Sequence, residues 1–256
     1  MSRLAKRLVK GAFAAMGYEL RRLPELYNSG PLGSEPLKDM LMLYRLRGGG
    51  GHPIIFDAGA NVGDFISAFR QTFDRPVIHA FEPGPEIFKK LQANTVGLPN
   101  VTLNNIGLAA KSGEMIFLEN DHVKMSSFLE PGKDCWGRIQ RQVKTQVGTI
   151  DDYCAENDIG QIDVLKCDTQ GYDLEVMYGA ERMLREGRLQ LIFTEINFSD
   201  MYKGQPGLDE IYRFLRTRNF RLVTFYRFAY QDNRAGWTDA LFARDDRADR
   251  KKTIQS

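Results

Sequence analysis

Two acidic residues, each following a short apolar run, are the first residues of this sequence that could do chemistry. One of them, Asp57, stands in the glycine-rich stretch IIFDAGANVGDF, ahead of Gly59, Asn61 and Gly63. Glycines at such a turn let the backbone approach a ligand closely and then turn into a helix. The stretch is not the G-x-G-x-x-G of a dinucleotide site, and an acid there would repel a pyrophosphate. The turn therefore favours a ligand that is cationic at this point and has no phosphate.

S-adenosylmethionine (SAM) is such a ligand, because it carries an ammonium and a sulfonium group. The second acid, Glu82, ends the apolar stretch PVIHAFEP, where a carboxylate can accept hydrogen bonds from ribose hydroxyls. We expect its neighbours Phe81 and Pro83 to contact the same ligand. The structural alternative is that Asp57 caps the turn and Glu82 is solvated. Two acids at predicted strand ends, with this spacing, favour the cofactor.

The elements that must position these acids are parallel strands whose carboxyl ends share one edge of a sheet. From residue 54 onward, apolar runs alternate with helical stripes, which predicts an α/β fold with helices on both faces. The runs expected as parallel strands are IIF, PVIHAFEP, VTLNNIGL, DVLKCD and LQLIFTEI. EMIFL and KTQVGTI are expected to flank an insertion over residues 119–142. The runs FRLVTF and ALFA follow each other without a helix, so we expect antiparallel neighbours.

Several of these stretches together resemble the FkbM family of SAM-dependent methyltransferases. They are FDAGANVGDF, HAFEPGPEIFKKLQAN, SSF, VGTIDDY, DVLKCDTQGYDLEVMYGAERML and IFTEIN, spanning roughly residues 53–198. The resemblance implies a Rossmann-like class I methyltransferase fold with a seven-stranded, mostly parallel sheet and an antiparallel last strand. It also implies SAM as methyl donor and usually a hydroxyl acceptor. The family element K-x-D-x-x-G-x-E has Asp173 here in place of glutamate.

Methyl transfer to oxygen needs an aligned acceptor and a group that removes or masks the hydroxyl proton. Asp168 is the first candidate for this base, and for a further cofactor contact, because we expect it on the same rim as the other two acids. Its structural alternative is a helix cap or a salt bridge with Lys166. His122, in the insertion, is a second candidate base because imidazole titrates near neutrality. A loop histidine can also be merely solvated.

A metal-dependent reaction is the other mechanism considered. Asp168, Glu195 and Asn197 offer hard oxygen ligands of the kind Mg²⁺ prefers, and metal-dependent catechol-type O-methyltransferases place similar ligands at strand ends. By that analogy Mg²⁺ could orient the acceptor and lower its pKa. The residues expected to shape the acceptor pocket are Ser126, Ser127 and Tyr172. Their structural alternatives are turn-forming serines and a packing tyrosine.

Length and composition predict how the chain is divided. The 256 residues suit one domain over 51–245, with a helical appendage and linker over 1–50 and a charged tail over 246–256. Three widely spaced cysteines fit a reducing, cytoplasmic compartment. A net charge of +2 gives no argument for nucleic acid, and none is expected as a partner. Ser34 could cap a helix that begins just after it.

The N-terminal stretch MSRLAKRLVKGAFAAMGYELRR has apolar residues at helical spacing with basic residues elsewhere on the wheel. We favour a helix docked on its own domain or on a partner. The alternative is a basic amphipathic helix at an anionic membrane surface, giving peripheral membrane association. No apolar run of the sequence is long enough to span a bilayer.

Other enzyme classes are disfavoured by the motifs they need. The sequence has no P-loop motif, no G-x-S-x-G and no N-P-P-Y-type motif of nucleic-acid methyltransferases. A non-catalytic SAM-binding module remains the rival of a different class. The resemblance suggests an acceptor hydroxyl on a sugar, glycan, lipid-linked saccharide or secondary metabolite, and the sequence does not choose among them or indicate the oligomeric state.

Overall fold

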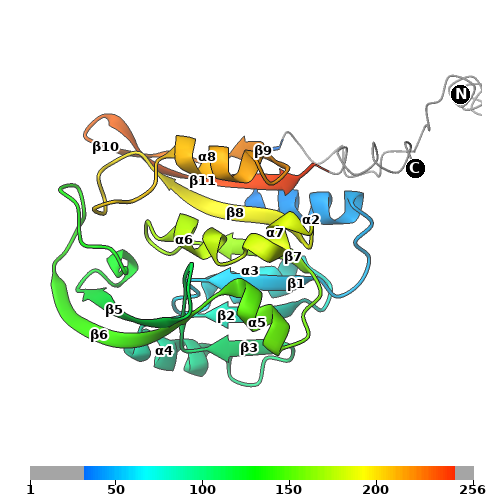
Figure 1. The fold of residues 1–256 in the computed structure, drawn as a ribbon, viewed down its shortest axis with the longest axis horizontal. Coiled ribbons are helices and arrows are strands. Elements are labelled where there is room, and N and C mark those ends of the chain that lie inside the picture. The colour runs from blue at the N-terminus through cyan, green and yellow to red at the C-terminus, as the bar shows by residue number, and fades with distance from the viewer. Residues whose placement is uncertain (1–31, 246–256) are drawn as a thin grey trace, which may run out of the picture. The chain divides into compact units, whose positions relative to one another are not determined.

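A computed structural model describes residues 32–245, which form an eight-stranded sheet with helices on both faces (Figure 1). The strands are β1 Ile54–Ala58, β2 Val77–Phe81, β3 Val101–Asn104, β7 Ile162–Cys167, β8 Leu189–Asn197, β9 Phe220–Phe225, β10 Ala229–Gln231 and β11 Arg234–Arg244. Their order is β3-β2-β1-β7-β8-β11, and β9 and β10 both pair with β11. The first five are parallel, whereas β11 runs antiparallel to β8 and β9. The expected class I fold with an antiparallel last strand is confirmed, and β10 is an addition to it.

Helices cover the two faces because successive strand residues point to opposite sides of the sheet. Ile55 belongs to the hydrophobic cluster under α2, α3 and α4, whereas Phe56 belongs to the cluster under α5 to α8. The helices are α2 Pro36–Leu46, α3 Asp64–Thr72, α4 Pro85–Thr95, α5 Ile150–Glu156, α6 Asp173–Tyr178, α7 Glu181–Arg185 and α8 Leu208–Arg216. The single helix expected after DVLKCD is therefore divided into α6 and α7.

A second, three-stranded sheet carries the predicted insertion. It consists of β4 Gly107–Leu108, β5 Gly113–Asn120 and β6 Ile139–Gly148, in the order β4-β6-β5. The strands β5 and β6 are antiparallel and curve along the left of Figure 1. A 3₁₀ turn, η2 Val123–Met125, follows β5. The stretch VTLNNIGL, expected as one strand, is instead shared between β3 and β4, which lie in different sheets.

Helix α2 belongs to the same compact unit as the sheet. This unit begins at Leu32, so the expected domain start at residue 51 is too late. Met40 of α2 is fully buried, and the Tyr226 hydroxyl donates to Asp39 Oδ2 over 3.2 Å. The N-cap of α2 is Glu35, not the expected Ser34.

The predicted N-terminal amphipathic helix and the charged tail lie outside the described residues. Their expected roles, including membrane contact, stay predictions. Among residues 32–245, the structure has no helix long and apolar enough to cross a membrane.

Candidate active site

The register of the parallel strands brings three predicted site residues to one edge of the sheet. They are Gly59, Glu82 and Asp168. Ala58 pairs with Phe81 of β2 and with Cys167 of β7, so the residues that follow these strands are neighbours. The backbone N–H groups of Gly59 and Ala60 both donate to the Phe81 carbonyl, and Asp168 N donates to the Ala58 carbonyl. The turn after β1 is thereby fixed against the ends of β2 and β7.

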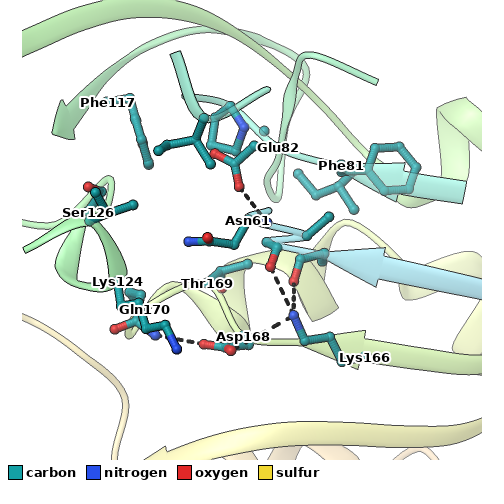
Figure 2. Close-up of a pocket in the computed structure, with 18 of the residues that line it drawn as sticks. Asn61, Phe81, Glu82, Phe117, Lys124, Ser126, Lys166, Asp168, Thr169 and Gln170 are labelled. Atoms are coloured by element: carbon teal, nitrogen blue, oxygen red, sulfur yellow. Dashed lines mark hydrogen bonds and ion pairs between the residues drawn. The ribbon is translucent and has the colours of Figure 1, made fainter. Parts of the chain in front are cut away.

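A pocket of about 1000 Å³, including the space at its mouth, opens at this edge (Figure 2). Predicted site residues that line it are Gly59, Asn61, Phe81, Glu82, Pro83, Ser126 and Asp168. Figure 2 shows Glu82 and Asp168 on opposite sides of the pocket, with Asn61 between them. The small sheet and the insertion supply lining residues that the sequence did not indicate, among them Phe117, Lys124 and Phe128.

The glycine-rich turn has the backbone geometry that its residue types allow. Gly59 has φ 74°, and a Cβ atom there would lie 2.1 Å from the Asp168 carbonyl oxygen, so only glycine fits. Asn61 has φ 49°, in the left-handed region that asparagine tolerates, which explains why a second glycine is not needed. Gly63 is the N-cap of α3 and packs near Leu91 instead of lining the pocket.

Glu82 is anchored by the backbone at the end of β2. Its Oε2 accepts from Asn61 N and its Oε1 from Gly84 N, each over 2.9 Å. Burial raises the pKa of this carboxyl to about 7, against the lowering effect of these two hydrogen bonds. Each carboxylate oxygen has a further lone pair, so Glu82 can also accept hydrogen bonds from a ligand in the pocket.

Asp57 does not face the pocket, which corrects the expectation that it meets a cationic ligand. Its side chain is fully buried, and its Oδ1 lies 2.9 Å from Lys166 Nζ. Lys166 is its register partner on β7 and also donates to the Gly59 carbonyl over 2.9 Å. Burial alone would lower the pKa of the Lys166 ammonium, but Asp57 and Asp168 beside it raise that pKa. The lysine therefore stays charged and compensates Asp57 inside the protein.

Asp168 reaches the pocket with its carboxylate held in place. Gln170 Nε2 donates to Asp168 Oδ1 over 2.6 Å, and Lys166 Nζ lies 3.8 Å from Oδ2. The Asp168 side chain is 38% exposed, so it is open to a ligand. The Tyr202 hydroxyl in turn donates to Gln170 Oε1 over 2.7 Å. Tyr202 was not indicated by the sequence, because its partner Gln170 lies 32 residues away along the chain. Gln170 was also missed, although it stands only two residues after Asp168.

Three predicted residues lie near the pocket but do not line it. Ser127 is buried and donates to the Gln170 carbonyl over 2.8 Å, and Tyr172 is buried with its hydroxyl against Met115 Sδ. The ring of His122 contacts Trp136, with 6.1 Å between centroids. Ser127 and Tyr172 therefore do not line this pocket as expected, and the role of His122 as a base stays a prediction. Ser126 does line the pocket, and its Oγ accepts from Asn120 N over 3.0 Å.

The geometry agrees with a comparison against known protein families. A family model described as the methyltransferase FkbM domain matches residues 57–222. The chain belongs to the FkbM methyltransferase family. It is therefore a SAM-dependent methyltransferase, with the class I Rossmann-like fold described above.

Two curated proteins are similar to this FkbM-family chain. The 2-O-methyltransferase NoeI of Sinorhizobium fredii (strain NBRC 101917 / NGR234) is 25% identical over 182 residues, covering 67% of this chain and 73% of that protein. Methyltransferase sdnD of Sordaria araneosa is 26% identical over 158 residues, covering 51% of this chain and 61% of that protein. Among solved structures, SAM-bound magnesium protoporphyrin IX methyltransferase of Synechocystis PCC 6803 is 11% identical. It covers 94% of this chain and 97% of its own, with a TM-score of 0.45.

The FkbM element K-x-D-x-x-G-x-E places its last acid in the interior of this protein. Asp173 is 1% exposed and accepts from the Thr194 hydroxyl over 3.1 Å. Burial, with Asp168 nearby, raises its pKa to about 7. Asp173 therefore supports the fold beneath the site and does not line the pocket.

The tentative metal ligands of this FkbM domain are only partly brought together. Asn197 Nδ2 donates to Glu195 Oε2 over 3.1 Å, and neither residue lines the pocket with Asp168. Burial raises the pKa of Glu195 well above its usual range, and Asp168 and Asp173 raise it further. Within residues 32–245, no group of three or more His, Cys, Asp or Glu side chains is arranged to hold a metal ion. Metal binding stays a prediction.

Proposed function

We propose that this FkbM-family methyltransferase methylates a hydroxyl oxygen on a sugar, glycan or secondary-metabolite acceptor. The observation that carries the proposal is the Asp168 carboxylate, which is exposed in the pocket and oriented by Gln170. A carboxylate so placed suits an acceptor that must lose a proton during the reaction. The name of NoeI, a 2-O-methyltransferase, supports oxygen as the accepting atom.

The residues present fit SAM as the methyl donor. The turn at Gly59 and Asn61 lines the pocket with backbone, and Glu82 has free lone pairs for ribose hydroxyls. Phe117, whose side chain lines the pocket, offers an apolar face that suits an adenine ring. Asp64, which also lines the pocket, offers a carboxylate for an ammonium group.

The reaction is an in-line displacement at carbon. When bound, SAM supplies an electrophilic methyl group on its sulfonium. In that displacement the C–S bond of SAM would break as the acceptor oxygen takes the methyl group, and the electron pair of the C–S bond would remain on sulfur. Asp168 takes the hydroxyl proton and passes it to solvent, because its side chain is partly exposed.

Use of Mg²⁺ is a second form of the same proposal. Asp168, Glu195 and Asn197 would hold the ion and orient the acceptor hydroxyl. EDTA would then abolish turnover and added Mg²⁺ would restore it. Unchanged turnover in EDTA would eliminate this form and leave Asp168 as a metal-free base.

The test is transfer of a trideuteromethyl group from labelled SAM to fractionated saccharide, glycan, lipid-linked and metabolite pools, followed by mass spectrometry. We expect an alkali-stable methyl ether with the wild-type chain and at most traces with Asp168→Asn. A methylated nitrogen or carbon would contradict the proposal. Labelled products in lipid-linked or macromolecular fractions alone would move it to that acceptor class. SAM binding without product from any pool would indicate a non-catalytic module.

A further inference from the structure

The two tryptophans of the chain pack against each other. Trp136 lies in the loop between β5 and β6, and Trp237 lies in β11. Their ring centroids are 5.4 Å apart with planes at 75°, so the two rings form a corner. Trp136 is 41% exposed, so much of this large aromatic side chain is in contact with solvent. The ring of His122 also lies near Trp136, with 6.1 Å between centroids.

The loop that carries Trp136 is tied to the main domain at several points. Pro131 forms an isolated β-bridge with Tyr202, and Gly132 N donates to the Met201 carbonyl over 2.8 Å. Asn120 Nδ2 donates to the Trp136 carbonyl itself over 2.9 Å. The exposed ring is therefore held in a fixed place, which reduces the entropy cost of binding a ligand to it.

Hydrogen bonds connect this corner with the mouth of the pocket. Asn120, which holds Trp136, also donates through its backbone N–H to Ser126 Oγ, and Ser126 lines the pocket. Asn120 thus links the backbone of Trp136 to a residue that lines the pocket.

Polar side chains follow Trp237 across the sheet towards Asp168. Trp237 pairs in register with Asn197, and Asp239 pairs with Glu195. Because alternate strand residues share a face, these four side chains point to the same side of the sheet. Cys167 pairs in register with Thr194, so Asp168 and Glu195, the next residues along β7 and β8, are neighbours. Hydrogen-bonding groups therefore lie between the reacting edge and the aromatic corner.

We propose that Trp136 and Trp237 form an acceptor subsite that stacks a pyranose ring, with Glu195 and Asn197 binding its hydroxyls. A pyranose has an apolar C–H face that packs on an electron-rich aromatic face, and a rim of hydroxyls that needs acceptors and donors. Few other ligands combine an apolar ring face with a rim of hydroxyl groups. The inference rests on the proposed function and names the class of its acceptor, a saccharide.

Tryptophan fluorescence tests the subsite directly, because both tryptophans of the full chain stand at the corner. The probes are methyl pyranosides and pyranose disaccharides, added to the chain saturated with S-adenosylhomocysteine, up to about 100 mM. Sorbitol, a polyol without a ring, is the control ligand. We expect a saturable change of emission with at least one pyranoside and none with sorbitol. No saturable change with any saccharide, or an equal change with sorbitol, would overturn the proposal.

Variants separate stacking from general packing. Trp136→Phe keeps an aromatic face, whereas Trp136→Leu removes it, so the leucine variant should bind the responding saccharide at least about tenfold more weakly than the phenylalanine variant. Affinity is measured by calorimetry, since each variant loses one fluorophore. Tyr212→Leu is the matched control, because Tyr212 on α8 is 40% exposed and does not line the pocket. Equal affinities of the two Trp136 variants would contradict stacking.

Two further results would also contradict the proposed subsite without contradicting the proposed methyl transfer. Acrylamide that fails to quench the free chain would show that the corner is covered, by a second copy or by residues 1–31. SAM binding that persists in a chain with no saccharide response would place the acceptor elsewhere. Loss of SAM binding, in contrast, would refute the proposed function itself.

Discussion

At the residue scale, the charge of Asp57 is compensated by Lys166 inside the protein. Both side chains are almost fully buried, at 0% and 2% exposure. Removing the lysine leaves a buried carboxylate without its partner, which is strongly unfavourable. We predict that Lys166→Met lowers the free energy of unfolding by about 3–5 kcal/mol, measured by urea denaturation. Lys111→Met, at an exposed position, should change it by less than about 0.5 kcal/mol.

The double variant Asp57→Leu, Lys166→Met checks the cause of that loss. If the unpaired charge is responsible, the double variant is more stable than Lys166→Met alone. A double variant no more stable than the single one would mean that packing of the lysine stem, not charge, is lost.

Glu82 makes stability depend on pH. Its pKa in the folded protein, about 7, is above its ordinary value of 4.5, so the fold binds this proton more tightly than the unfolded chain does. The stabilisation is fully present below the ordinary value and is lost as pH rises through about 7, by about 3 kcal/mol in all. We predict that the stability of wild type minus that of Glu82→Gln falls by this amount between about pH 4.5 and 8.

Urea denaturation across that pH range measures the difference. The subtraction matters because Asp173 and Asp239, whose pKa values burial raises to about 7 and about 6, titrate in the same window. A difference that stays constant with pH would show that Glu82 keeps an ordinary pKa.

Asp168 and Tyr202 should affect catalysis in different ways. Asp168→Asn removes the base, and we predict a fall in kcat of about 10²-fold or more with SAM affinity within about threefold. Tyr202 is a positioning residue, because its hydroxyl reaches Asp168 only through Gln170. Tyr202→Phe should lower kcat by about tenfold and leave the KM for SAM unchanged. Steady-state kinetics checks both, and an unchanged kcat in Asp168→Asn would exclude it as the base.

At the element scale, the turn between β1 and α3 depends on one glycine. Gly59 and Gly97 have almost the same φ, 74° and 75°, but only Gly59 has a neighbour where a Cβ would stand. The backbone strain of Gly97→Ala alone costs about 1–2 kcal/mol. Gly59→Ala adds a clash with the Asp168 carbonyl, so we predict a larger loss of stability and no SAM binding. Thermal unfolding and calorimetry compare the two variants, and equal behaviour would contradict the close approach.

The long elements were predictable from the sequence, whereas the short ones were not. The apolar runs of β1, β2, β7 and β8 give a strong signal because these strands are buried on both faces. Strand β10 has three residues, and β4 has two that pair with a distant strand, so neither has a periodicity to detect. The break between α6 and α7 comes from Gly179, where a Cβ would lie 2.2 Å from the Ala109 carbonyl oxygen.

At the scale of the whole molecule, site residues were predictable where the chain itself brings them to a strand end. Gly59, Glu82 and Asp168 follow adjacent parallel strands, so their meeting is a consequence of the fold. Phe117 comes from β5 of the second sheet and Lys124 from the turn η2 after it, and their docking depends on long-range packing that the sequence does not reveal. The role of Asp57 was wrong because it depends on Lys166, a charged residue within an apolar run. Lys166 in the run DVLKCD was the sequence feature that could have indicated a buried partner for Asp57.

The central claim is that the pocket between Glu82 and Asp168 binds SAM. Calorimetric titration of the full chain with SAM, and separately with NAD⁺, tests it most directly when repeated with Glu82→Ala. We predict saturable one-site binding of SAM, at least about tenfold weaker in the variant, and no heat from NAD⁺. Absence of SAM binding by the wild-type chain, or an affinity that Glu82→Ala leaves unchanged, would contradict the account.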